Sequence, residues 1–125
     1  MSLVEELFED MGYDYEKAKV GHKQVVFYAE GQCAGFAGTF MADDIIYISF
    51  IIVRPSLQRK GIGSQLVRFL IQSYDKEGRL KPIMSKCKKE VIQFFRQAGF
   101  MQIGDEDNGE ITMWIPPKRK AKKVN

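Results

Sequence analysis

The chain has 125 residues, of which 45% are hydrophobic and 28% are charged, and its formal net charge is +3. Because this length is close to the commonest domain size, we expect one domain over residues 1–117, with enough apolar residues to exclude a disordered chain. No apolar run reaches the roughly 18 residues that a membrane span needs, and the acidic N-terminus does not suit a signal peptide. We therefore expect a cytoplasmic protein without a membrane partner.

The positive charge is concentrated at the C-terminus. Residues 118–125 contain five cations and no acid, so the rest of the chain carries a net charge of about −2 (+3 less +5). We expect these residues to form a basic flexible tail, which is too short to favour a nucleic-acid partner. Cys33 and Cys87, with a single histidine, are too few for a disulfide scaffold or a metal site, so no bound metal is expected.

Hydrophobic patterning predicts nine elements in the order α-β-β-β-α-β-α-β-β, which is a mixed α/β (α+β) domain. The predicted helices cover residues 2–10, 61–77 and 88–98, a loop covers 11–22, and the predicted strands cover 24–30, 32–42, 45–53, 80–86, 100–103 and 110–115. The strand IIYISFIIV at 45–53 is apolar on both faces, as expected for a central strand that is covered on both sides.

The two longer predicted helices are amphipathic. Their expected buried faces are Ile62, Leu66, Phe69 and Leu70 in the first, and Val91, Phe94, Phe95 and Ala98 in the second. Gly78 and Gly99 are expected to end these helices. Gly35 and Gly38, inside a predicted strand, indicate a bulge or a close backbone approach.

The stretch FIIVRPSLQRKGIGS at residues 50–64 joins the central strand to the first long helix. A helix N-terminus has unpaired N–H groups and partial positive charge, so it is a natural anion site. Gly61 and Gly63 allow an anion to approach the backbone, and Arg59 and Lys60 add charge. The nucleotide P-loop pattern is absent, and Leu66 occupies the third glycine position of the dinucleotide fingerprint. The sequence therefore predicts a different kind of phosphate-binding loop.

The run from Val53 to Ser64, VRPSLQRKGIGS, resembles the acetyl-CoA signature [Q/R]-x-x-G-x-[G/A] of the GNAT superfamily of N-acetyltransferases. The later Ala98-Gly99-Phe100 is similar to the end of the F-Y-x-x-x-G-F segment of that family. The resemblance implies a mostly antiparallel central sheet flanked by helices, with a V-shaped split between the strands at 45–53 and 80–86. It also implies acetyl-CoA as cosubstrate and an amine acceptor, without a metal.

In this family the pantetheine arm lies in the split and the pyrophosphate lies on the backbone amides of the loop. The resemblance implies a cofactor site formed by Ile51, Ile52, Val53, Gln58, Arg59, Lys60, Gly61, Ile62, Gly63, Ser64 and Phe95. The backbone rather than the side chains is expected to hold the phosphates. The side chains of Arg59 and Lys60 are therefore equally consistent with phosphate contacts and with solvated charges that contact no ligand.

The sequence departs from the family pattern where catalysis is concerned. Phe95 stands where many members carry a proton-donating Tyr, and Tyr47 stands where some carry a basic Glu. Tyr47, Ser85 and Cys87 are weak catalytic candidates, because each fits a core or strand position better, and His22 is weaker still. Two functions stay open: acetyl transfer to a primary amine by direct attack in a ternary complex, or a catalytically weak acyl-CoA sensor or partner-binding module.

The N-terminal part is also shorter than the family pattern. About 23 residues precede the first clear strand, whereas members generally begin with a strand and two helices. The acceptor side is then shortened, or a second copy of the chain completes it, so a homodimer is one expectation. The sequence does not identify the acceptor amine.

Overall fold

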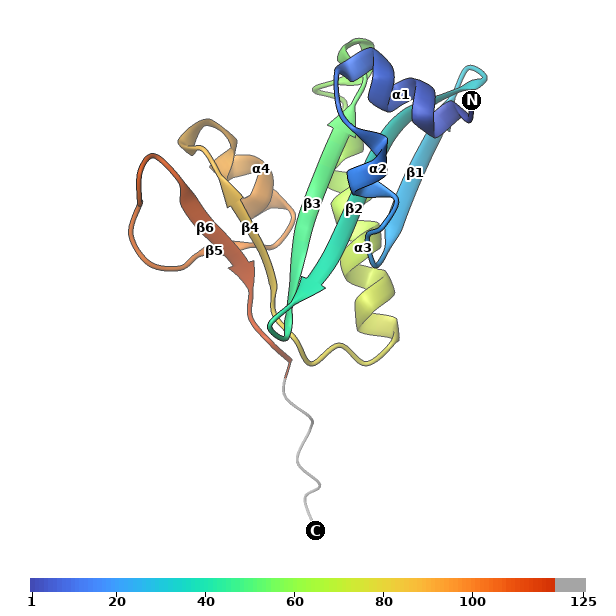
Figure 1. Ribbon diagram of the computed structural model, residues 1–125. Helices are drawn as coiled ribbons and strands as arrows, with labels where there is room; N and C mark the ends of the chain where they lie inside the picture. The colour runs from blue at the N-terminus through green and yellow to red at the C-terminus, as the bar shows by residue number, and fades with distance from the viewer. Residues whose placement is uncertain (119–125) are drawn as a thin grey trace.

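The computed structural model describes residues 1–118, which form a six-stranded sheet of order β1-β2-β3-β4-β6-β5 (Figure 1). The strands are β1 (Gln24–Ala29), β2 (Gln32–Ala42), β3 (Ile45–Val53), β4 (Ile83–Cys87), β5 (Met101–Gln102) and β6 (Ile111–Ile115). All neighbouring strands are antiparallel except β3 and β4, which are parallel. The predicted mixed, mostly antiparallel sheet is confirmed. Most of the predicted basic tail lies outside the described residues.

The sheet divides between β3 and β4. These strands pair at only two positions, Ile46 with Ile83 and Tyr47 with Met84. Beyond Tyr47, β3 continues to Val53 paired with β2 alone, while β4 continues beside β6. Figure 1 shows the two strands diverging from this contact. The sheet therefore has the V-shaped split that the resemblance implied, with its vertex at Tyr47 and Met84.

Helices cover the two faces of the sheet unequally. They are α1 (Leu3–Met11), α2 (Tyr15–Ala18), α3 (Ile62–Lys76) and α4 (Ile92–Gln97), with the 3₁₀ turns η1 (Pro55–Leu57) and η2 (Lys89–Val91). α1 and α2 lie over β1, β2 and the end of β3, whereas α3 and α4 lie on the opposite face (Figure 1). Of the helices in residues 1–118, none covers β4 and β6 on the α1 side, so part of the sheet is open there in the described structure.

α2 was not predicted, because four residues carry too little periodicity to distinguish a helix from a loop. It begins at Asp14, whose side chain accepts a hydrogen bond from the Glu16 N–H. The first helix was predicted correctly. Its N-cap Ser2 forms a capping box with Glu5, and its only fully buried side chains, Leu7 and Phe8, pack on the sheet.

Three burial predictions were wrong in detail. Phe69 is 59% exposed, because the buried face of α3 passes through Leu66, Val67, Leu70 and Tyr74 and leaves Phe69 beyond its edge. Val91 is 43% exposed, because the chain forms a 3₁₀ turn there before α4 begins. β3 is fully buried only at Ile46 and Ile52, since the helices on its α1 side reach only its end.

β3 contains a bulge beside the split. Gly38 pairs with Phe50 and Thr39 pairs with Ile48, so Ser49 has no partner on β2. The close backbone approach predicted at the two strand glycines is confirmed. A Cβ at Gly38 would lie 3.1 Å from the Phe36 ring, and one at Gly35 would lie 3.0 Å from the Leu66 side chain.

Arg79 joins three segments near the closed end of the V. Its side chain, 2% exposed, donates from Nε to Asp75 Oδ1 of α3 at 2.8 Å. Its Nη1 donates to the Lys81 carbonyl before β4 at 2.7 Å and to the Pro116 carbonyl after β6 at 3.1 Å. Burial acts to raise the pKa of Asp75, but hydrogen bonds from Arg79 and Lys118 outweigh it and lower this pKa below its usual range.

Asp75→Asn is expected to lower the free energy of unfolding by about 1–2 kcal/mol at neutral pH, because it removes the charge from these hydrogen bonds. The folded pKa of Asp75 lies below the unfolded value, so its stabilisation is present above pH of about 4 and is lost as pH falls through the folded pKa. Urea unfolding should show a constant deficit between about pH 5 and 7 that closes toward about pH 2. An equal deficit in Asp105→Asn, whose carboxylate is exposed, would contradict this assignment.

Candidate functional site

A cavity of about 850 Å³ lies beside the open arm of β3, on the face that α3 and α4 cover. Its walls come from the end of β3, the η1–α3 loop, and η2 with α4. The lining residues are Ile51, Val53, Leu57, Gln58, Arg59, Gly61, Ile62, Gly63, Ser64, Glu90, Val91, Gln93, Phe94, Phe95 and Gln97. All the residues of the implied cofactor site except Ile52 and Lys60 are among them.

The loop that borders this cavity has a continuous set of unpaired backbone donors. Within residues 1–118, no protein acceptor pairs with the N–H groups of residues 59–64. Gly61 is the N-cap of α3 in a left-handed conformation (φ 78°), and no side chain caps the helix. These N–H groups, with the partial positive charge of the 15-residue helix α3, create an anion-binding surface.

Gly63 allows the first turn of α3 to lie against both neighbouring walls. A Cβ at this position would come within 3.0 Å of Phe94 Cε2 and 3.6 Å of Val53 Cγ2. Any side chain here would press on the α4 wall and narrow the cavity next to the free N–H groups. Packing and not an unusual backbone angle therefore favours a small residue at this point, in agreement with the glycine or alanine of the signature.

The open edge of β3 exposes hydrogen-bonding groups as well. The Arg54 N–H donates to the Ala34 carbonyl of β2 at 2.9 Å, so by strand alternation Val53 and Ile51 direct their N–H and C=O groups toward the split. Gln58 Nε2 donates to the Val53 carbonyl at 3.0 Å. Ile52 instead faces β2 with its backbone, and its side chain, 3% exposed, packs under α1.

The polar residues that η2 and α4 contribute to the cavity were not predicted from the sequence. Glu90, Gln93 and Gln97 line the cavity opposite the loop. Gln93 and Gln97 are spaced i, i+4 on one face of α4, and Glu90 lies in η2 just before it, so the periodicity of the helix could have identified the two glutamines. The apolar residues of the same helix predicted only the face that packs on the core.

None of the three weak catalytic candidates lines the cavity. Ser85 and Cys87 are each 7% exposed on the face covered by α3 and α4, and burial raises the pKa of the Cys87 thiol. Tyr47 lies on the opposite face, where its ring stacks on Phe40 with centroids 5.0 Å apart. Phe95 does line the cavity and contacts Phe94 and Phe100 edge to face.

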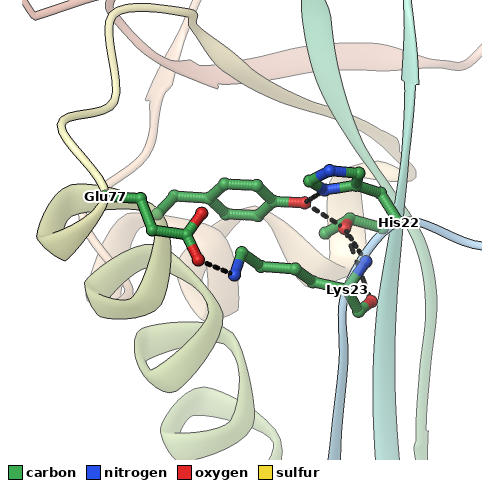
Figure 2. Close-up of polar contacts among 5 residues, drawn as sticks. His22, Lys23 and Glu77 are labelled. Carbon is green, nitrogen blue, oxygen red and sulfur yellow. Dashed lines mark hydrogen bonds and ion pairs between the residues drawn. The ribbon is translucent and has the colours of Figure 1, made fainter.

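His22 belongs to a separate polar cluster between the start of β1 and the end of α3 (Figure 2). Its Nδ1 lies 2.8 Å from the Tyr74 hydroxyl, which also bonds to Thr39 Oγ1 at 2.5 Å. Burial raises the pKa of Tyr74, and the hydrogen bond to Thr39 offsets this only in part. Lys23 pairs with Glu77 beside them. This cluster fixes β1 to α3 and lies away from the cavity.

Comparison with known proteins identifies the fold. The model of the acetyltransferase (GNAT) family matches residues 2–100. The chain belongs to the GNAT acetyltransferase family. Among the described residues, no group of three or more potential metal ligands comes together, and no helix has the length and apolar character to cross a membrane.

Solved structures agree with this assignment of the fold. A Bacillus subtilis acetyltransferase in complex with CoA is 22% identical, with a TM-score of 0.70 over 90% of this chain and 91% of that one. The Escherichia coli ribosomal-protein-S18-alanine N-acetyltransferase is 21% identical, with a TM-score of 0.69 over 85% and 76%. An aminoglycoside 6'-N-acetyltransferase complexed with coenzyme A is 13% identical, with a TM-score of 0.75 over 96% and 92%.

Both cysteines are expected to be inert toward thiol reagents in the folded protein. Burial raises the pKa of Cys33 and of Cys87, so little thiolate is present at about pH 8 and reagents cannot reach it. Titration with a chromogenic disulfide should label neither thiol quickly before unfolding and both after it. Fast native labelling that Cys87→Ser abolishes would show a reactive thiol and return Cys87 to the catalytic candidates.

Proposed function

We propose that the protein transfers an acetyl group from acetyl-CoA to a primary amine within a ternary complex. The observation that carries this proposal is the set of free backbone N–H groups at residues 59–64, which borders the cavity beside the open edge of β3. Family membership supports an acyltransferase, and the CoA present in two of the similar structures supports the cosubstrate.

The residues around the cavity fit such a cosubstrate. The N–H groups of the loop would hold the pyrophosphate, with Gly61 and Gly63 leaving the backbone accessible. The outward groups of Ile51 and Val53 would pair with the pantetheine amides as an added strand does. Phe94 and Phe95 provide the apolar wall beside that arm. When bound, acetyl-CoA supplies an acetyl group that is activated as a thioester.

The reaction needs a neutral amine close to the thioester. The amine nitrogen forms the C–N bond, the C–S bond breaks, the sulfur leaves as thiolate, and one proton passes from nitrogen to water or to the thiolate. The chain would supply positioning, worth up to about 7–11 kcal/mol, and the Val53 N–H as a donor to the carbonyl oxygen. No side-chain acid is required, because a thiolate with a pKa of about 8.5 leaves readily.

The cavity favours an acceptor that deprotonates easily. Glu90 is its only carboxylate, and no Tyr, His or Cys occurs among the described lining residues. Deprotonating a lysine amine at about pH 7 costs about 4–5 kcal/mol, whereas an α-amine near pKa 8 costs about 1 kcal/mol. We therefore propose an α-amine as the acceptor. Efficient acetylation of lysine side chains with no reaction at α-amines would contradict this choice.

Gly63→Val is expected to weaken acetyl-CoA binding about 5–10-fold, because a side chain larger than the alanine that the signature allows would displace Phe94, which lines the cavity. Calorimetric titration measures the change. Gly38→Val is the matched control, since its Cβ would also meet a ring carbon, that of Phe36 at 3.1 Å, but away from the cavity. Both variants should lose similar stability. An equal loss of affinity in both, or none in either, would contradict the cofactor site.

The absence of an acid beside the thioester also favours the second candidate function, an acyl-CoA sensor with little turnover. Phe95 is 5% exposed at the position where many relatives have Tyr. Phe95→Tyr is expected to raise kcat about 10-fold if transfer is the function, which is below the roughly 10²–10⁴-fold effect of a general acid because the thiolate already leaves readily. Tight acetyl-CoA binding with no thiol release from any amine, in the wild type and in this variant, would instead identify a sensor.

A further inference from the structure

Five apolar side chains form a continuous row across the open face of the sheet. Cross-strand register pairs Phe40 with Tyr47, Tyr47 with Met84, Met84 with Trp114, and Trp114 with Met101. Directly paired residues share a face, so the row crosses β2, β3, β4, β6 and β5 without a break. We call these five residues the aromatic–thioether row.

The row lies on the α1 side of the sheet, in the part that none of the helices within residues 1–118 covers. The alternate residues of the same strands, Ile46, Ile83 and Met113, are buried in the core under α3 and α4, so the row points the other way. Phe40 is 43% exposed and Met101 is 53% exposed, and the three residues between them are partly buried. A chain of exposed rings and thioethers this long is unusual for a surface that contacts only water.

The row passes through the vertex of the split. Tyr47 and Met84 are the last paired residues before β3 and β4 separate. The cofactor cavity occupies the α3–α4 side, so an acceptor amine that approaches from the open face enters the split just beyond this pair, where the strands separate. The position of the row therefore connects it with the acceptor.

The length of the row distinguishes between classes of acceptor. Neighbouring strands are about 4.8 Å apart, so the three spacings from Tyr47 to Met101 cover about 14 Å. A small amine would contact one or two of these side chains, whereas an extended peptide at about 3.3 Å per residue would cover the distance with about four residues. Phe40, Met84 and Met101 have no strong donor or acceptor, and Tyr47 and Trp114 have one polar group each, so the row presents mainly apolar surface suited to apolar side chains.

We infer that the acceptor is the N-terminal segment of a polypeptide with large apolar residues among its first four positions, bound along the aromatic–thioether row. Its α-amine lies just beyond Tyr47 and Met84, where the strands separate, and its chain runs across β4 toward Trp114 and Met101. This inference rests on the proposed function and narrows it, because the same α-amine is the acceptor that needs no side-chain base. Tyr47 is then a specificity-determining residue and not the missing base.

The test compares three acceptors with acetyl-CoA: alaninamide, the peptide Ala-Leu-Phe-Leu-Gly-Ser, and the matched peptide Ala-Ser-Gly-Ser-Gly-Ser. The apolar peptide should have a kcat/KM at least about 20-fold higher than the polar one, chiefly through KM. Met101→Ser should raise the KM of the apolar peptide about 3–10-fold, whereas Phe40→Ser, at the end of the row that the peptide does not reach, should leave this KM unchanged. Neither should change kcat, the KM of acetyl-CoA, or the turnover of alaninamide.

The chain contains matched control substitutions. Met41→Ser and Phe69→Ser alter residues that are also exposed, 39% and 59%, but lie outside the row, so they should leave peptide KM unchanged. Equal rates for the two peptides, with alaninamide acetylated, would overturn the assignment of the row as the peptide-binding surface. The proposed function would still hold. A homodimer that Phe40→Ser dissociates, with no effect of Met101→Ser on the peptide KM, would also overturn this assignment by assigning the row to a second copy.

The two proposals can fail separately. If no acceptor is acetylated, the proposed function fails. Calorimetric titration of the apolar peptide into the protein with acetyl-CoA then tests separately whether the row binds a peptide. Peptide binding that Met101→Ser weakens and Met41→Ser does not would support the row as a peptide-binding surface. Absence of binding would overturn the inference as well.

Discussion

The short parallel contact between β3 and β4 determines most of what this fold can do. Two residue pairs and a hydrogen bond from the Ile46 N–H to the Pro82 carbonyl at 3.0 Å join the two halves of the sheet. Because the contact is this short, the end of β3 has an unpaired backbone edge, which elsewhere would be a liability. Arg79 holds the segments near the vertex together from the side and allows the arms to separate.

The anion-binding loop depends on the same split. The chain leaves β3 at Arg54, whose side chain donates to the Cys33 carbonyl and to Asp10 of α1, each at 2.8 Å. This fixes the start of the loop between the sheet and α1, and the loop then turns with Arg59 in a left-handed conformation (φ 65°). A strained non-glycine residue costs about 1 kcal/mol or more, so its position directly before the free N–H groups indicates a functional constraint.

The sequence predicted the strands, the longer helices and the loop because each depends on local spacing. Alternation identifies β1 to β3, and the glycines with the following amphipathic pattern identify the start of α3. The aromatic–thioether row could not be predicted, because its neighbours come from five strands and only the register brings them together. Phe69 was misplaced for a related reason: periodicity defines an apolar stripe, but its exact edge depends on how α3 packs against the sheet.

The features that depart from the family pattern are consistent with one another. In the proposed transfer, a cavity without Tyr, His or Cys among its described lining residues would offer little proton transfer, so an acceptor of low pKa and its orientation would lower the barrier. Orientation of an extended chain would require contacts beyond the reacting atoms, and the open face would provide them next to the vertex. Binding energy from remote parts of a substrate can contribute to the reacting geometry, so a long apolar row can compensate for an absent acid or base.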